Sequence, residues 1–269
     1  MKRSIPILLY HHVSPDREIT PAGFERQLRW MLDQGYQSLS MTELMDEVKG
    51  RSHSDRPGFV VTFDDGYLDN WVYVYPILQK LSVKAVYYLV TERVETHAAP
   101  RAITDIPDTR SNERQAGTFL SWAEARVMAG SGLVEFGSHT HTHRHFVRKE
   151  LFSNVEEELR LSKQLIEAEL KRPCLHLAWP WGDYEKNWWP TLEKVGFETA
   201  MTTQSGANTV GTNSFALKRL KVGREDLKWF ESRCRWNSNA LAANTFALTY
   251  GWDRRFKTWL HSESPYSHG

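Results

Sequence analysis

A run of histidines, residues 139–145, is the stretch whose side chains could most directly do chemistry. It holds four of the chain's 11 histidines and directly follows a short apolar stretch, residues 133–138. Histidine is the commonest metal ligand, and two imidazoles four residues apart can converge on one cation. A solvated loop or a metal-scavenging tract would have a similar composition. Because the run lies between two well-patterned segments, we favour a specific metal site.

Two adjacent carboxylates, Asp64 and Asp65, follow an apolar stretch, residues 58–63, and precede Gly66. Neighbouring side chains of an extended chain point in opposite directions, but a turn at Gly66 would let both reach one cleft. One could then bind a metal while the other takes a proton from water. Asp-Gly is also common in turns and at helix N-termini. With a histidine run at an equivalent strand end, we favour a functional pair.

Apolar stretches that alternate with helical patterns must position these groups. Such alternation predicts parallel βα units in one α/β domain. The carboxyl ends of parallel strands converge on the active site, so polar clusters that follow different strands should meet. Four strands end in such clusters: His11-His12, Asp64-Asp65-Gly66, residues 139–145 and residues 179–183. The expected strands are residues 4–13, 58–63, 83–90, 133–138, 175–179, 198–202 and 217–222.

Helix starts are marked by Thr20-Pro21 and by capping-box patterns at Ser40 and Ser121. Another helix is expected over residues 68–81. The clearest helix is expected over residues 153–171, with Glu156, Glu157 and Glu158 on its solvated face. Residues 91–120 show no period, and a loop of that length suggests a lid or binding loop beside the site.

Composition sets further limits. A net charge of +1 gives no reason to expect nucleic acid or a membrane surface as partner. Two cysteines, Cys174 and Cys234, form no disulfide framework and are expected to be buried thiols. Residues 1–10 lack the features of a signal peptide, and no stretch approaches the ~18 apolar residues of a membrane span. A cytoplasmic location is therefore expected, although a chain trimmed of its leader would look the same.

Three segments resemble motifs of the NodB-type polysaccharide deacetylases, the carbohydrate esterase family 4 group. Residues 62–66, Thr-Phe-Asp-Asp-Gly, resemble the first motif, and residues 138–143, Ser-His-Thr-His-Thr-His, the second. Residues 178–184 resemble the third, an aromatic-Pro-Tyr-Gly turn. The opening residues 8–13, Leu-Leu-Tyr-His-His-Val, are similar to the subgroup that deacetylates poly-N-acetylglucosamine. Order and spacing agree from about residue 5 to 225.

The resemblance implies a fold and a division of the chain. The fold would be a distorted (β/α) barrel of about seven parallel strands. Residues 1–225 would form the deacetylase domain, and residues 226–269 a Trp-rich C-terminal extension packed on it. That extension could also cover the site or meet another subunit, and the oligomeric state is left open.

The resemblance also implies roles for site residues. Asp65, His139 and His143 would bind a divalent metal, most simply Zn²⁺, although Co²⁺, Ni²⁺ or Fe²⁺ would suit the same ligands. Asp64 would be the general base for the attacking water. The backbone N–H of Trp181 would stabilise the oxyanion.

The general acid is implied less directly. Most of the family uses a histidine from a late Leu-x-His motif, and residues 259–261 lack the strand that should precede it. In the exopolysaccharide subgroup, which resembles a circular permutation, the histidine of the N-terminal Tyr-His takes that place. We therefore predict His11 as the acid, whereas His12 would point to the other face and be structural.

Two features depart from the family pattern. Many members have an arginine before the third motif that holds the base aspartate, and this chain has Ala178 there. Arg219 is a candidate replacement. The extra histidines, His141 and His145, have the same four-residue separation as the chosen pair. We reject them as ligands because the flanks of His139 match the motif.

Aromatic residues of the third motif would contact the substrate. Trp179, Pro180, Trp181 and Tyr184 are the predicted substrate-binding residues, since aromatic faces suit the apolar faces of sugar rings. Trp188 and Trp189 could equally stack on a sugar or pack a helix on the barrel.

Three functions are compatible with these residues. The first is metal-dependent removal of N-acetyl groups from amino sugars of a polysaccharide or its intracellular precursor. The second is hydrolysis of a non-sugar amide or cyclic imide on the same scaffold, which the missing arginine keeps open. The third is a catalytically silent carbohydrate-binding protein, disfavoured because base, ligands and candidate acid are all present.

Overall fold

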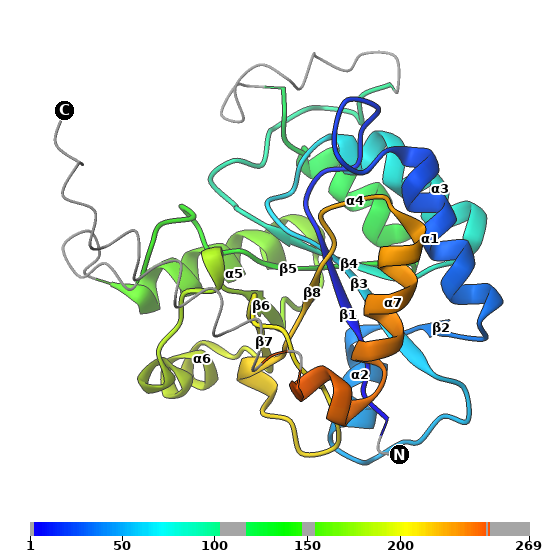
Figure 1. Cartoon of the computed structure of the whole chain (residues 1–269). Coiled ribbons are helices and arrows are strands. Elements are labelled where there is room, and N and C mark those ends of the chain that lie inside the picture. The colour runs from blue at the N-terminus through cyan, green and yellow to red at the C-terminus, as the bar shows by residue number, and fades with distance from the viewer. Residues whose placement is uncertain (1–2, 103–116, 147–153, 246, 248–269) are drawn as a thin grey trace, which may run out of the picture.

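A twisted parallel sheet wrapped by helices forms the centre of the molecule (Figure 1). The computed structural model describes residues 3–102, 117–146, 154–245 and 247. Within these residues there are eight strands: β1 (Ile7–Tyr10), β2 (Gln37–Ser38), β3 (Gly58–Phe63), β4 (Ala85–Leu89), β5 (Val134–Ser138), β6 (His176–Ala178), β7 (Thr199–Met201) and β8 (Leu220–Lys221).

Seven strands lie in the order β7-β6-β5-β4-β3-β1-β8, and β2 pairs with β3. Each pairing is parallel. The segment before β8 brings the two sheet edges together. Leu217 donates to the carbonyl of Ala200 in β7 and accepts from the N–H of Thr202, which follows β7, and Leu220 pairs with Leu8 of β1. The predicted distorted barrel of about seven parallel strands is confirmed.

The helices begin where their caps predict. Thr20 accepts a hydrogen bond from the N–H of Gly23, and Ser40 and Ser121 each form a complete capping box. The α-helices are α1 (Pro21–Asp33), α2 (Met41–Val48), α3 (Tyr75–Leu81), α4 (Trp122–Gly130), α5 (Val155–Leu170), α6 (Trp189–Val195) and α7 (Leu227–Asn237).

The helix expected over residues 68–81 is divided. Asn70–Val74 forms a π-helical turn, in which the N–H of Tyr75 reaches the carbonyl of Asn70, and α3 follows. Pro76 lies at the start of α3 and has no N–H to donate, so a regular ladder cannot pass through it.

Strand residues alternate between two apolar clusters. Ile7 and Val60 lie in the cluster inside the barrel, whereas Leu8 and Val61 lie in the cluster beneath the helices. The same alternation predicts which way the side chains point in the residues that follow each strand. His11 has the parity of Ile7, and Asp64 has the parity of Val60, so both belong on the inner side.

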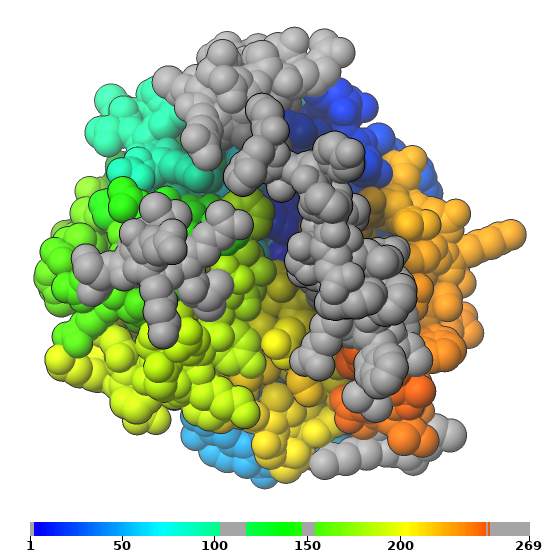
Figure 2. Space-filling model, turned by 60° about the vertical axis from the view of Figure 1, so that its left-hand side comes forward, coloured from blue at the N-terminus to red at the C-terminus, as the bar shows by residue number. Residues whose placement is uncertain are grey.

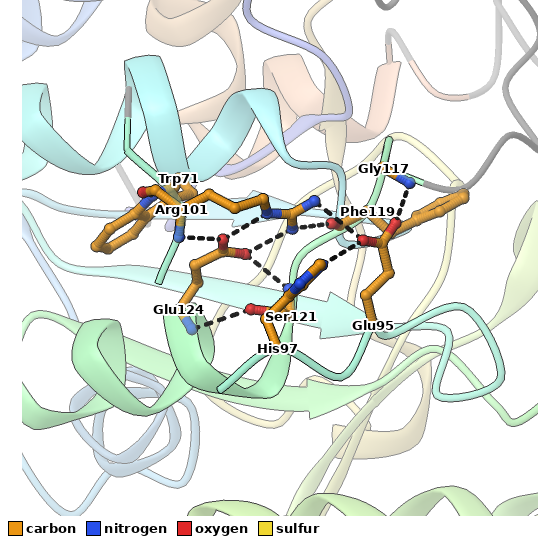
Figure 3. Close-up of polar contacts among 8 residues, drawn as sticks. All are labelled: Trp71, Glu95, His97, Arg101, Gly117, Phe119, Ser121 and Glu124. Carbon is orange, nitrogen blue, oxygen red and sulfur yellow. Dashed lines mark hydrogen bonds and ion pairs between the residues drawn. The ribbon is translucent and has the colours of Figure 1, made fainter. Parts of the chain in front are cut away.

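Buried charge holds the segment after β4 against the start of α4 (Figure 3). Arg101 donates to both carboxylate oxygens of Glu124, at 2.7 and 2.8 Å, and to Glu95 at 3.0 Å. Its carbonyl accepts from Trp71 Nε1, and its guanidinium donates to the carbonyl of Phe119. Residues 95–101 and 117–124 are therefore joined by one ion-pair network.

The last α-helix labelled in Figure 1, α7, packs against the first, α1. Phe230, which is fully buried, meets Trp30 edge to face with ring centroids 5.9 Å apart. Cys174 and Cys234 are free and buried, as predicted. The division of the chain at residue 225 stays a prediction, and residues 248–269, with Trp252, Trp259 and His261, lie outside the described residues.

A search of the described residues for a helix both long and apolar enough to cross a membrane finds none.

Candidate metal and catalytic site

Three predicted ligands meet at the carboxyl ends of β3 and β5. Asp65, His139 and His143 offer one ligand atom each, and these atoms lie within 4.8 Å of one another. Asp65 Oδ1 is 3.2 Å from His143 Nε2 and 3.6 Å from His139 Nε2. They come from strand ends far apart in sequence, as convergence predicts. Figure 2 shows blue N-terminal residues recessed beside green residues from the middle of the chain on one face.

The donor set fits a cation. His139 Nδ1 lies 2.7 Å from the carbonyl of Ala178, which can only accept, so Nδ1 carries the proton and Nε2 presents its lone pair. Burial lowers the pKa of His139 to about 4, which keeps the ring neutral near pH 7. Opposite it, Asp65 Oδ1 is buried and has no hydrogen-bond partner among the described residues. Two electron-rich atoms that face each other in a buried site favour a positive group between them.

The charge of Asp65 also favours a cation. Burial alone would raise the pKa of this carboxyl, but the neighbouring imidazoles of His143 and His139 hold it well below its ordinary value. Asp65 is therefore ionised across the physiological range, and it supplies the one formal negative charge of the three ligands.

The histidine loop is held by a residue that sequence reasoning misplaced. Glu158 of α5 is buried, and it accepts hydrogen bonds from the backbone N–H groups of His141 and Thr142 and from the Thr142 hydroxyl. The prediction that Glu158 lies on a solvated face is therefore wrong. The spacing along the helix could have indicated that Glu158 is buried. It lies four residues before Ser162 and eight before Ile166, which are both buried on the inner face of α5.

Strained backbone gathers at this site. Asp65, Thr140, His143 and Trp181 have positive φ values of 71°, 66°, 59° and 61°. Non-glycine residues seldom adopt this region, and for a β-branched residue such as Thr140 it is an outlier. Each costs of order 1–3 kcal/mol and persists only where the surroundings enforce it. The fold thus maintains these turns against local preference.

Asp64 is the buried partner of Arg219. Two parallel bonds of 2.7 Å join the guanidinium to both carboxylate oxygens. Arg219 also donates to the carbonyl of Thr202 and to the Thr62 hydroxyl, and its guanidinium lies over the ring of Tyr88. Burial alone would raise the pKa of Asp64, but the charge of Arg219 leaves it lowered. Arg219, the candidate for the arginine that Ala178 replaces, thus contacts Asp64 from the segment before β8.

His11 follows β1 beside this pair. The N–H of Asp64 donates to the carbonyl of Tyr10, so the two strand ends are in register. The carbonyl of His11 accepts from the Asn70 side chain at 3.0 Å. Burial lowers the pKa of the His11 imidazole, and the negative charges of Asp64 and Asp65 oppose that shift.

His12 makes a different set of contacts. Its Nδ1 is 2.8 Å from Asp69 Oδ2, and its ring stacks on Tyr67 with centroids 3.7 Å apart. The two consecutive histidines therefore have separate surroundings, one facing the aspartate pair and one facing Asp69.

The third motif divides into buried and exposed residues. Trp179 is fully buried between Phe146 and Trp188, and Pro180 is also buried. Neither side chain presents a surface, and their predicted contact with substrate stays a prediction. Tyr184 is partly buried and packs against the core. Trp188 and Trp189 pack there too.

Trp181 differs from its neighbours, because 58% of its surface is exposed. Its ring lies 5.4 Å from that of His143 and 4.6 Å from that of His145. His145 in turn contacts Asp183, whereas His141 contacts the Thr91 hydroxyl. Neither extra histidine belongs to the Asp65 cluster.

Both described ends of the expected lid contact the site loops. Thr91 and Glu92 donate to the carbonyls of Thr140 and His141, and Leu120 donates to the carbonyl of Gly66. Residues 103–116 lie outside the described residues.

The fold and a family model together define the class of protein. The model for the family described as polysaccharide deacetylase matches residues 51–200, more than half of the 269-residue chain. The chain belongs to the polysaccharide deacetylase family. It is therefore classed with the carbohydrate deacetylases, which are hydrolases.

Particular relatives agree with this class. YxkH of Bacillus subtilis (strain 168), which bears a polysaccharide deacetylase name, is 25% identical over 222 residues, 81% of this chain and 71% of YxkH. The poly-beta-1,6-N-acetyl-D-glucosamine N-deacetylase of Escherichia coli (strain K12) is 24% identical over 214 residues, 70% of this chain but only 31% of that protein. The solved structure of IcaB from Ammonifex degensii shares the fold, with a TM-score of 0.71 at 21% identity over 88% of this chain and 98% of IcaB.

Proposed function

We propose that the chain is a metal-dependent hydrolase that removes N-acetyl groups from amino sugars of a polysaccharide or its precursor. The observation that carries this proposal is the Asp64–Arg219 pair beside the Asp65, His139 and His143 cluster. An ionised, oriented carboxylate next to three convergent ligands is what amide hydrolysis by water requires. The E. coli relative's name supports an N-acetylated sugar as substrate.

The three ligands would hold a divalent metal, with Zn²⁺ as the first choice and Co²⁺, Ni²⁺ or Fe²⁺ also suited to an Asp-His-His set. Bound there, the metal would supply Lewis-acid activation of the attacking water and of the acetamide carbonyl. His139 keeps its lone pair toward the site because Ala178 fixes its tautomer.

The chain's own residues would then move the protons. Asp64, held by Arg219, takes a proton from water as the water oxygen attacks the carbonyl carbon. The backbone N–H of Trp181 donates to the developing oxyanion. His11 must be protonated for the next step, and the negative charges of Asp64 and Asp65 favour that form. It gives its proton to the amine as the C–N bond breaks, so that acetate and a free amino sugar are the products.

The main argument for the alternative function, hydrolysis of a non-sugar amide or cyclic imide, no longer holds. It rested on the absence of a family arginine at Ala178, and Arg219 now pairs with Asp64. No observation favours that alternative, and we do not propose it.

Acetate release from N-acetylglucosamine oligomers, with and without a chelator, tests the proposal. Chelation should abolish release, and Zn²⁺ or Co²⁺ should restore it. Asp64→Asn should retain the metal but lose activity about 100-fold or more, whereas His139→Ala should lose both. Full activity in Asp64→Asn would refute the base assignment. Turnover of cyclic imides but not sugars, or metal binding without turnover of either, would refute the function.

A further inference from the structure

Trp181 presents a large aromatic ring to solvent beside the candidate metal site. Its side chain is the most accessible of the third motif, with 58% exposed. The turn beneath it is fixed: Trp181 has φ of 61°, and its carbonyl accepts from the Thr203 hydroxyl. Gly182 has φ of 76°, and a Cβ there would lie 2.1 Å from Thr203 Oγ1. The backbone is thus held tightly, but it does not by itself fix the indole.

His145 fixes the indole from one side. Its ring stacks on Trp181 with centroids 4.6 Å apart and planes 15° from parallel. Such parallel contact orients both rings. His145 Nδ1 lies 2.9 Å from Asp183 Oδ2, and Asp183 is two residues after Trp181. Asp183 therefore holds the imidazole, and the imidazole holds the indole.

Among the residues that the structure describes, this arrangement leaves one indole face open. His145 covers one side, and the ring edge approaches His143, with centroids 5.4 Å apart and planes 55° apart. An aromatic face that is rigid and desolvated on its back is suited to the apolar face of a sugar ring. The open face lies next to a candidate ligand, so a sugar stacked there would neighbour the reacting group.

We propose that His145 and Asp183 are positioning residues that hold the indole of Trp181 as a stacking surface for a sugar ring of the substrate. This inference rests on the proposed function for its substrate class. It assigns a role to the fourth histidine of the run, which lies outside the ligand set. The effect belongs to substrate affinity and leaves the bond-breaking step unchanged.

Steady-state kinetics with two substrates would test the inference. N-acetylglucosamine oligomers can reach the indole, whereas a small chromogenic acetate ester reports the reactive centre alone. His145→Ala and Asp183→Asn should raise KM for oligomers about 3- to 10-fold, the range expected for losing one aromatic contact. Their kcat, ester turnover and metal content should stay within about twofold of wild type.

Two further variants separate positioning from a general loss of structure. His145→Phe restores an aromatic stack without the contact to Asp183, so its oligomer KM should lie between those of wild type and His145→Ala. Trp236→Ala removes another exposed indole, on α7 and 47% exposed, and should leave KM unchanged. Thermal melting checks that each variant is folded.

Unchanged oligomer KM in His145→Ala would overturn the inference, and so would a parallel loss of ester turnover and metal. Failure of the proposed function has a different signature, because the metal-loaded wild type would then release no acetate from any oligomer. In that event calorimetric binding of intact oligomers to wild type and His145→Ala decides the matter. Weaker binding by the variant supports the inference, and equal binding or none refutes it.

Discussion

Arg219 sets the surroundings of Asp64, the proposed base. The pair is buried, and two bonds orient both carboxylate oxygens. Replacing Arg219 with Met would leave a buried carboxylate without its partner, so the pKa of Asp64 should rise. We expect the acidic limb of the kcat/KM profile to move to higher pH, and the maximal value to fall about 100-fold through lost orientation.

The control for this prediction is Lys228→Met, which removes one positive charge from an exposed position on α7. It should leave the profile unchanged. An Arg219→Met enzyme whose acidic limb stays where the wild-type limb lies would show that Arg219 does not govern Asp64.

His176 of β6 makes stability depend on pH. Burial lowers the pKa of its imidazole to about 4, from an ordinary value of about 6.5. Between pH 4 and 6.5 the His176 imidazole is protonated in the unfolded chain but neutral in the folded chain. The free energy of unfolding therefore rises with pH in this range and falls as the pH drops from 6.5 toward 4. Replacing His176 with Asn should reduce the loss of unfolding free energy between pH 7 and 4.5 by roughly 2 kcal/mol. Urea titrations at both pH values measure it, and parallel curves for variant and wild type would contradict it.

At the scale of elements, Arg101 joins two segments to the start of α4. Glu124 is fully buried, and Arg101→Met would leave it without its cation. Burial would then raise the pKa of Glu124, which Arg101 now lowers. We expect the free energy of unfolding to fall by about 3 kcal/mol, measured by urea denaturation.

Arg126→Met is the matched control, because Arg126 lies on α4, the helix that carries Glu124. Arg126 and its partner Glu169 are 47% and 39% exposed, so the loss should stay within about 1 kcal/mol. The double variant Arg101→Met, Glu124→Leu should recover much of the stability, since an apolar pair can replace a buried ion pair. Equal small losses in both single variants would show that the network contributes little.

For the whole molecule, the packing of α7 on α1 predicts one cooperative unit. Phe230 is fully buried, and Phe230→Ala should lower the unfolding free energy by about 3 kcal/mol. Denaturation should remain a single transition when followed by fluorescence and by circular dichroism. Trp236→Ala on the same helix should cost about 0.5 kcal/mol or less. A second, separate transition in Phe230→Ala would indicate that α7 belongs to an independent domain.

Much of this architecture follows from local patterns. Thr20, Ser40 and Ser121 cap helices where expected, and β3 has the predicted bounds. Strand periodicity also places the polar clusters at one end of a parallel barrel. Local patterns cannot reveal long-range pairing: Arg219 was one candidate among many cations, and 155 positions separate it from Asp64.

Burial of polar and aromatic groups was harder to foresee. Glu158 looks like a solvated helix residue, yet it is buried because the loop donors of His141 and Thr142 satisfy its carboxylate. Trp179 and Trp181 are two residues apart in an aromatic motif. Trp181 has a positive φ and an exposed ring, whereas Trp179 packs inside.

The position of Arg219 near the end of the barrel has a consequence for biosynthesis. Asp65, His139 and His143 are synthesised well before residue 219. The partner of β1 that follows Arg219, β8, is the last of the described strands in chain order. A nascent chain would therefore contain the three candidate metal ligands before Asp64 can pair with the guanidinium of Arg219. The proposed base would therefore reach its paired state only after the final strand docks, so the two parts of the candidate site would form at different stages of synthesis.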